Sequence, residues 1–174
     1  MKHVIGILCL FSLIILPACR VGSQLPSLTT PSYCWYNNNI TYKDPYGALY
    51  NWYTVNTGKL CPTGWHVPSN DEWQVLCNFL GGDSVAGRKM KEAGYTHWQW
   101  NSEQTNNFSG FTAVGAGGFD FGSFSELRLS TYFWTPNINS NGDVNIRVFL
   151  NGYKLLLSNS IKDRGYSVRC LKDF

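Results

Sequence analysis

Apolar residues recur at helical spacing between Pro68 and Gly81, with polar residues between them. Four of the apolar side chains stand at i, i+3, i+4 and i+7 and so share one face: Trp73, Leu76, Cys77 and Leu80. Ser69 and Glu72 have the spacing of a capping box, in which each side chain binds a backbone N–H of the other residue. Pro68 disfavours helix before this point and Gly81-Gly82 supplies a stop. The pattern predicts a helix over 69–80.

A shorter helical pattern follows over 83–93. Ser84 is its candidate cap and Gly94 its candidate end, while Gly87 weakens it. Three residues that suit a buried face fall on one side of it: Ala86, Met90 and Ala93. We therefore expect two helices in succession, of which the first is the stronger.

Segments rich in strand-forming residues occupy much of the remaining chain: 46–55, 96–100, 108–114, 127–134, 144–150, 153–157 and 166–171. In 46–55 a short helical turn is an alternative, because apolar and polar residues alternate only weakly there. Asn151-Gly152 predicts a tight hairpin. The Gly-rich stretch 115–122 is not followed by the helix and the Lys of a phosphate-binding loop, so it predicts irregular backbone or bulges instead.

The first residues have the pattern of an export signal, since Lys2 precedes an apolar run over 4–16 that is too short to span a membrane. The run ends in Leu16-Pro17-Ala18-Cys19, which resembles a bacterial lipobox, so we expect cleavage before Cys19 and lipidation of its thiol. An ordinary signal peptide with a chance cysteine is the alternative. Lipidation implies an exported protein anchored in the cell envelope, and Arg20 after the lipid site favours the outer membrane or cell surface.

This interpretation divides the chain into three parts. Residues 1–18 are a lipoprotein signal peptide, 19–32 a flexible, Pro- and Ser-containing membrane tether, and 33–174 a single folded domain. The 14 Lys and Arg residues nearly balance 11 Asp and Glu residues and form no basic run, which excludes nucleic acid as a partner class. With 7 Trp, 10 Tyr and 10 Phe, the composition suits a loop-rich exported domain held by aromatic packing.

Four of the six cysteines remain after Cys9 of the signal and Cys19 are set aside: Cys34, Cys61, Cys77 and Cys170. Export permits disulfides, and four cysteines allow three pairings. No C-x-x-C or H-x-x-x-H pair occurs, so structural bridges are favoured over a zinc site. We expect no metal and no cofactor.

A set of motifs in fixed order gives the chain a family resemblance. The motifs are Tyr46-Gly47-x-Leu49-Tyr50-Asn51-Trp52, Cys61-Pro62-x-Gly64-Trp65-His66-Val67-Pro68-Ser69-x-x-Glu72-Trp73, Ser109-Gly110-Phe111-x-Ala113, Tyr132-Phe133-Trp134-Thr135 and Gly165-Tyr166-Ser167-Val168-Arg169-Cys170. Together they resemble the Fibrobacter succinogenes major paralogous domain family of exported bacterial proteins. The family pattern is close to Gly-Tyr-Trp-Trp-Ser-Ser where this chain has Ser130 to Thr135, so Phe133 departs from it.

More distantly, the segment from Trp65 to Trp73 and the closing Gly165 to Cys170 resemble motifs of sulfatase-modifying, formylglycine-generating enzymes. That resemblance implies an α+β, C-type-lectin-like fold. Such a fold has two short helices packed on small twisted antiparallel sheets, with long irregular loops.

The resemblance does not imply activity. The formylglycine-generating enzymes use a reactive cysteine pair, whereas Cys77 falls on a predicted buried helix face and Cys170 in the last predicted strand. The calcium-binding motifs of C-type lectins do not occur. His66, between Trp65 and Val67 in a predicted strand, suits a hydrogen-bonded structural role rather than a base, and no nucleophile can be assigned to His97. Asp120 with Glu126 is a weak candidate carboxylate pair.

We therefore expect no enzyme and no catalytic residue. The leading interpretation is a non-catalytic, surface-tethered binding or adhesion module for a glycan or a protein partner. One alternative is a structural cell-envelope lipoprotein without a ligand. Another is a degenerate relative of the sulfatase-modifying enzymes with an unrecognised activity.

The resemblance also bears on the cysteines and on the ligand face. Cys61 and Cys170 both lie inside the family-like motifs, so we expect them to pair; Cys34 and Cys77 could then form a second bridge or stay reduced.

In a C-type-lectin-like fold the segment after the second helix, here 95–124, forms loops on one side. If 96–100 is extended, two Trp rings share a face beside amide and carboxylate groups. These residues form the predicted ligand site, with core packing of the rings as the alternative: Trp98, Trp100, Asn101, Glu103 and Asn106.

Overall fold

A mixed five-stranded sheet is the largest element of the fold. The computed structural model describes residues 29–101, 104–150 and 154–173. The sheet has the order β5-β4-β6-β7-β8, and its strands are β4 (Ala116–Asp120), β5 (Ser123–Leu127), β6 (Thr131–Ile138), β7 (Val144–Phe149) and β8 (Leu155–Ser160). All neighbours pair antiparallel except β4 and β6, which are parallel. Since β7 and β8 pair, the predicted hairpin around 151–152 is confirmed, although its turn lies outside the described residues.

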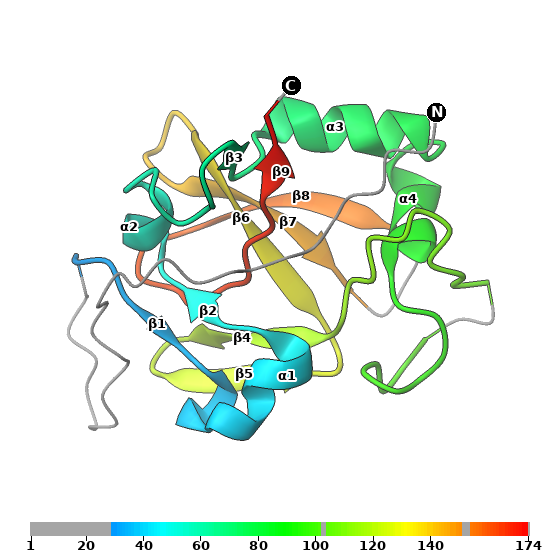
Figure 1. Cartoon of the computed structure of the whole chain (residues 1–174), viewed down its shortest axis with the longest axis horizontal. Coiled ribbons are helices and arrows are strands. Elements are labelled where there is room, and N and C mark those ends of the chain that lie inside the picture. The colour runs from blue at the N-terminus through cyan, green and yellow to red at the C-terminus, as the bar shows by residue number, and fades with distance from the viewer. Residues whose placement is uncertain (1–28, 102–103, 151–153, 174) are drawn as a thin grey trace.

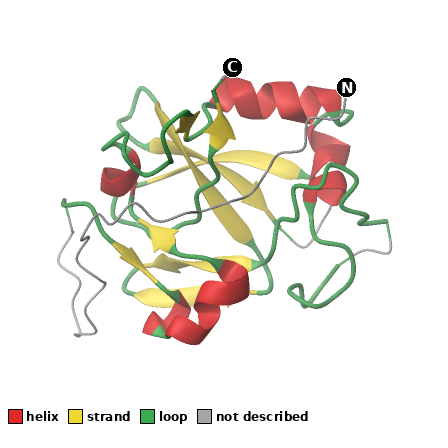
Figure 2. Ribbon diagram, viewed as in Figure 1, coloured by secondary structure: helices red, strands yellow, loops and turns green. Residues whose placement is uncertain are grey.

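Two small antiparallel sheets and short helices complete the α+β fold (Figures 1 and 2). β1 (Tyr33–Cys34) pairs with β2 (Leu49–Tyr50), and β3 (Trp65–His66) pairs with β9 (Leu171–Lys172). The helices are α1 (Lys43–Tyr46), α2 (Trp52–Val55), α3 (Asn70–Phe79) and α4 (Asp83–Met90), and two 3-10 turns cover Tyr36–Asn38 and Ile40–Tyr42. In Figure 1, α3 lies at the top of the molecule and α1 lies with the β4–β5 hairpin at the bottom. The predicted α+β class is therefore correct.

Helix α3 forms as its sequence predicts. The Ser69 hydroxyl accepts from the Glu72 N–H at 3.3 Å, and the Glu72 carboxylate accepts from the Ser69 N–H at 2.8 Å, completing the capping box. Trp73, Cys77 and Leu80 are buried, with Leu76 packed against the same core cluster. The first of the two predicted helices thus has the expected cap and the expected buried face.

Helix α4 begins at Asp83, as predicted, but its cap differs from the prediction and it ends earlier. Its N-cap is Gly82, whose φ of 91° turns the chain into the helix, so Ser84 is not the cap. The Gly82 carbonyl accepts hydrogen bonds from the backbone N–H groups of Val85 and Ala86. The helix ends at Met90 because Lys91 is extended and forms a parallel bridge to Ala113.

Ser69→Ala should lower the free energy of unfolding by about 1 kcal/mol, because it removes the acceptor of a backbone donor at the start of α3. Urea melts of the variant and the wild type measure this difference. Ser84→Ala is the matched control, since Ser84 is exposed and caps nothing. Equal losses for the two variants would contradict the capping role of Ser69.

Several strand predictions are wrong, and tertiary contacts explain the differences. Residues 96–100 form bends rather than a strand, and 108–114 contains one isolated bridge. The predicted strand over 127–134 is split, because a turn at 128–130 ends β5 and lets β6 begin at Thr131. The Gly-rich stretch contains strand β4, where a Cβ on Gly117 would lie only 2.4 Å from the Ser125 carbonyl oxygen. In 46–55, the alternative of a helical turn is realised in α2, which Asn51 caps.

The folded part extends further towards the N-terminus than the predicted boundary at Tyr33. The Ser32 N–H donates to Asn51 Oδ1 at 3.1 Å and to Thr54 Oγ1 at 2.8 Å. The Asn51 amide donates to the Thr30 carbonyl at 2.8 Å. The last residues of the predicted tether are therefore held by the domain. The predicted signal peptide and Cys19 lie outside the described residues.

A disulfide joins Cys61 to Cys170 across 109 residues of sequence and confirms the expected pairing. It lies beside the β3–β9 pair, so the last strand is fixed against the segment that leads into α3. Of the two alternatives left open for Cys34 and Cys77, the second bridge does not form. The two thiols are buried in different core clusters, Cys77 on the buried face of α3 and Cys34 beside Leu49 and Phe119, which keeps them apart.

Candidate functional site

A cavity of about 430 Å³ lies between α1, the start of β6 and the segment before β9. We call it the aromatic pocket, after the four rings that line it: Trp35, Tyr46, Tyr50 and Phe133. Its volume is within the range of small-molecule sites, which are concave and mostly apolar with a few fixed polar groups. Exposed Asp44 and Pro45 form its rim, whereas Ala116, Thr131 and Phe133 are buried and form its floor.

Tyr46 is held at the edge of the pocket by a row of tyrosine rings. Its ring centroid lies 6.1 Å from that of Tyr42, which in turn lies 5.4 Å from that of Tyr36. Burial raises the Tyr46 pKa; nearby Arg128 lowers it, and Glu92 and Tyr42 raise it, so the net shift is upward. The Tyr46 phenol therefore stays protonated at neutral pH and can donate a hydrogen bond to a ligand.

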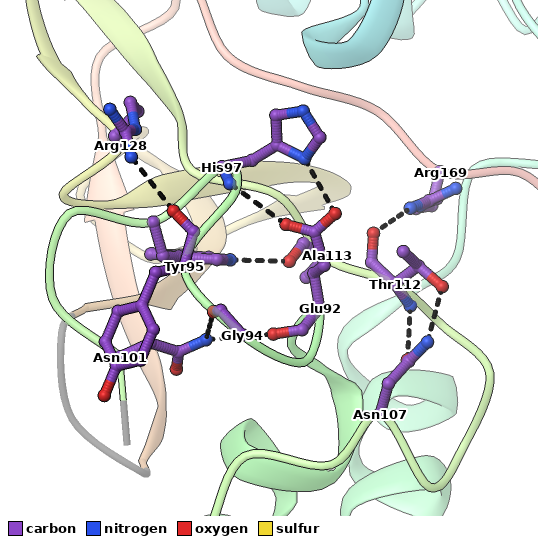
Figure 3. Close-up of polar contacts among 11 residues, drawn as sticks. Glu92, Gly94, Tyr95, His97, Asn101, Asn107, Thr112, Ala113, Arg128 and Arg169 are labelled. Carbon is purple, nitrogen blue, oxygen red and sulfur yellow. Dashed lines mark hydrogen bonds and ion pairs between the residues drawn. The ribbon is translucent and has the colours of Figure 1, made fainter. Parts of the chain in front are cut away.

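Glu92 and His97 form an oriented pair on the wall of the pocket (Figure 3). His97 Nδ1 lies 2.7 Å from Glu92 Oε1, and the backbone N–H of His97 donates to Glu92 Oε2 at 3.1 Å. A carboxylate at Nδ1 favours the tautomer that carries its proton there, which leaves Nε2 as an acceptor in the neutral ring. The Tyr46 ring meets the His97 ring edge-on, with centroids 5.4 Å apart.

Arg169 fixes another part of the wall. Its guanidinium donates to the carbonyls of Phe111 and Thr112 at 2.9 and 3.3 Å and lies over the Phe111 ring. Asn107 holds the same loop, because its side chain donates to Thr112 Oγ1 and accepts from the Thr112 N–H (Figure 3). The loop wall is thus set by side chains that are themselves fixed, which suits a preformed site.

Two hydroxyl groups at the base of the pocket have no hydrogen-bond partner among the described residues: Thr131 Oγ1 and Ser167 Oγ. Thr131 is 0% exposed and Ser167 6% exposed. Both backbones are fixed, since Thr131 pairs with Phe149 in the sheet and the Ser167 N–H donates to the Tyr132 carbonyl at 2.9 Å. The position of each hydroxyl is therefore set by the rotation of its side chain alone.

The structure does not bring the predicted ligand residues together. Trp98 is fully buried, with its Nε1 donating to the Ala113 carbonyl at 2.9 Å, so the prediction that it shares an exposed face with Trp100 is wrong. Its alternative, core packing, is correct. Trp100 is 58% exposed but does not line the aromatic pocket.

The two polar members of the predicted site that the structure describes, Asn101 and Asn106, also lie apart from the pocket. Asn101 donates to the carbonyls of Glu92 and Gly94 and so supports the loop behind the pocket. Asn106 is exposed and accepts from the Phe108 N–H. Glu103 lies outside the described residues.

A signal for the observed site was present in the sequence. Three of the family-like motifs meet at the pocket: Tyr46 and Tyr50 come from the first, Phe133 from the fourth, and Ser167 and Arg169 from the last. These motifs are far apart in sequence, and only the fold shows that they line one cavity. Glu92 and His97 had no distinguishing pattern, because their pairing depends on the loop after α4.

Asp120 and Glu126 do not act as a carboxylate pair. Asp120 forms an ion pair with Arg164, while Glu126 accepts hydrogen bonds from Ser130 and Tyr132. Burial raises the pKa of Asp120, and Arg164 opposes this shift. Each carboxylate thus has a separate structural partner.

His66 likewise belongs to a structural cluster. Its Nδ1 lies 2.6 Å from Asp173 and its Nε2 2.8 Å from Glu72, so the ring links β3 to β9 and α3. The hydrogen bond with Asp173 raises the His66 pKa, burial lowers it, and Glu72 raises it, giving a net upward shift. Burial alone would raise the Glu72 pKa, but hydrogen bonds from Ser69 and His66 lower it overall.

The pKa of His66 predicts a pH dependence of stability. Because the His66 pKa is raised in the folded state, the protonated ring stabilises the fold. This stabilisation is complete below the unfolded pKa of about 6.5 and is lost as pH rises through the folded pKa. Urea melts between pH 5.5 and 8 should therefore show that the stability of the wild type decreases as pH rises. His66→Gln should flatten this part of the profile, and an unchanged slope in the variant would contradict the assignment.

Two further properties concern only the part of the chain that the structure describes. There, no group of three or more His, Cys, Asp or Glu side chains is arranged to hold a metal ion. Nor does that part contain a helix long and apolar enough to cross a bilayer.

Comparison with known protein families finds a match for the chain. The family model described as the Fibrobacter succinogenes major domain matches residues 18–172, which include all the elements that form the aromatic pocket. No curated protein and no solved structure matches the chain. The match spans nearly the whole chain, and the five motifs that carry the resemblance all lie inside it. The chain therefore belongs to the Fibrobacter succinogenes major domain family.

Proposed function

We propose that the chain is a non-catalytic binding or adhesion module, tethered to the bacterial cell envelope, that binds a glycan or a protein partner in the aromatic pocket. The observation that supports this most directly is the pocket itself: four aromatic rings surround fixed polar groups in a cavity of about 430 Å³. Aromatic side chains present large contact areas to ligands, and the polar groups can fix a ligand's orientation.

The polar groups of the pocket support binding better than catalysis. A covalent mechanism needs a nucleophile within hydrogen-bond reach of a base. Glu92 orients His97, yet none of the hydrogen bonds among the described residues joins His97 Nε2 to a hydroxyl or thiol. Of the thiols, Cys77 lies on the buried face of α3, and burial raises its pKa to about 12, which makes it unreactive.

A C-type-lectin-like arrangement of the domain is part of the proposal. Three features support it. Helices α3 and α4 follow one another and pack against the large sheet through a shared core. β9 returns to pair with β3, just before α3. Between α4 and β4 the described chain runs through bends and isolated bridges, which presents loops beside the pocket.

Attachment through a lipid on Cys19 is the membrane-anchoring part of the proposal, and the lipobox-like end of the apolar run supports it. Metabolic labelling with a fatty-acid analogue should mark the wild type and leave Cys19→Ser unlabelled. Equal labelling of both proteins would contradict lipidation at this residue.

The binding proposal is tested with the full-length protein, purified in a detergent without a sugar headgroup, on arrays of glycans and of purified proteins. Tyr46→Ala should reduce retention on the recognised spots at least ten-fold, because it removes a ring from the pocket. Tyr53→Ala is the matched control, since Tyr53 is a half-buried tyrosine on α2 that does not line the pocket. Mass spectrometry of the retained ligand should show no chemical change.

The outcomes separate the candidate functions. Retention that is lost in Tyr46→Ala and kept in Tyr53→Ala supports the pocket as the site. Retention that is lost only in Trp100→Ala would place the ligand on the loop surface instead. A protein that is retained on no spot would contradict the binding proposal and favour a structural envelope role.

A further inference from the structure

The two unpartnered hydroxyls constrain what the aromatic pocket can bind. A buried hydroxyl without a hydrogen bond is unfavourable, and most such groups in folded proteins have a partner. Thr131 Oγ1 and Ser167 Oγ have none among the described residues, and both residues line the pocket. Their backbones are fixed by β6 and its neighbours, but each side chain can rotate about χ1, so a ligand in the pocket can supply the missing hydrogen bonds.

The charges around the pocket favour a neutral ligand. Two cationic side chains, Lys43 and Arg169, and two acidic ones, Asp44 and Glu92, contribute to its lining, so the charges balance. The Glu92 carboxylate binds His97, and the Arg169 guanidinium binds two carbonyls. An ionic ligand would therefore meet no excess of opposite charge, while a purely apolar ligand would leave both hydroxyls unpaired.

We propose that the aromatic pocket binds a neutral saccharide unit and that Thr131 Oγ1 and Ser167 Oγ form hydrogen bonds with its hydroxyl groups. This inference rests on the proposed function and names its ligand class. A sugar hydroxyl can both donate and accept, which matches Ser and Thr side chains and the acceptor at His97 Nε2. The apolar C–H face of a sugar ring suits contact with the Tyr46 and Tyr50 rings.

Isosteric substitutions separate this role from a structural one. Thr131→Val and Ser167→Ala remove the hydroxyls while keeping most of the side-chain volume. Because these hydroxyls have no partner within the protein, their removal should leave the melting temperature unchanged or raise it. Thr135→Val is the matched control on the same strand: Thr135 is also 0% exposed, but its hydroxyl donates to the Asn145 carbonyl at 2.8 Å and it does not line the pocket.

The test titrates glucose, galactose, mannose and N-acetylglucosamine, with glucuronate as the acidic probe, into the full-length protein in a zwitterionic detergent. Ligand-observed NMR and calorimetry measure binding. We expect at least one neutral sugar to bind more tightly than glucuronate. Its affinity should fall at least ten-fold in Thr131→Val and in Ser167→Ala and stay unchanged in Thr135→Val.

Three results would overturn the inference: no binding of any neutral sugar, preference for glucuronate, or unchanged affinity in both pocket variants. The array experiment above distinguishes these failures from failure of the proposed function. If Tyr46→Ala still abolishes retention on a protein spot, the pocket remains a binding site but its ligand is not a saccharide.

Discussion

Trp98→Ala should lower the free energy of unfolding by about 3–5 kcal/mol, because it removes a large buried ring and leaves a cavity. Trp98 is 0% exposed and lies in the core cluster formed with α3 and α4. The substitution also removes the donor to the Ala113 carbonyl. Urea melts and thermal unfolding of the purified protein measure the loss.

Lys91 increases the expected effect of Trp98→Ala. Its ammonium lies 3.9 Å from the centroid of the Trp98 ring and donates to the Leu150 carbonyl. Burial lowers the Lys91 pKa to about 8, so the side chain is still mostly charged at neutral pH. Without the indole, this buried charge loses a favourable contact with an aromatic face.

Trp100→Ala is the matched control for Trp98→Ala. Trp100 is 58% exposed, and surface substitutions usually change stability by less than about 0.5 kcal/mol. If Trp98→Ala were as stable as Trp100→Ala, the core position of Trp98 would be wrong and a ligand role for both rings would regain support.

Removal of the disulfide should have the second large effect. Cys61 and Cys170 close a loop of over a hundred residues, for which the chain-entropy model gives about 4–5 kcal/mol of stabilisation. The double variant Cys61→Ala with Cys170→Ala should therefore show a loss of this size in urea melts. The pairing of β3 with β9 and the His66 contacts with Asp173 depend on the same junction, so the C-terminal strand should lose protection first.

A reducing agent provides the control for the disulfide variant. The reduced wild type should unfold at the same urea concentration as the double variant, and the double variant should not respond to the reductant. A wild type that is equally stable with and without reductant would contradict the stabilising role of this bridge.

Local interactions explain which parts of the fold could be predicted. Helix α3 was predictable because its cap, its apolar face and its stop lie within a few residues of one another. In contrast, the alternation of Trp98 and Trp100 suggested a strand, whereas the chain turns there so that one ring enters the core and the other stays outside.

The site was harder to predict because its parts come from distant segments. Tyr46, Thr131 and Ser167 come from α1, from β6 and from the segment before β9, which are joined by the bridges between Tyr50 and Tyr166 and between Phe133 and Ser167. No local pattern reveals a hydroxyl that lacks a partner, since this depends on every neighbour in the folded state. The family-like motifs marked most of the right segments without showing their common cavity.

The most direct test of the pocket as the binding site is hydrogen–deuterium exchange of the full-length protein with and without the ligand that the arrays retain best. We expect ligand-dependent protection over 43–50, 131–133 and 166–169, the segments that carry the aromatic pocket, and little change elsewhere. Protection confined to α3 or to the exposed loop around Trp100, with none at these three segments, would contradict the assignment.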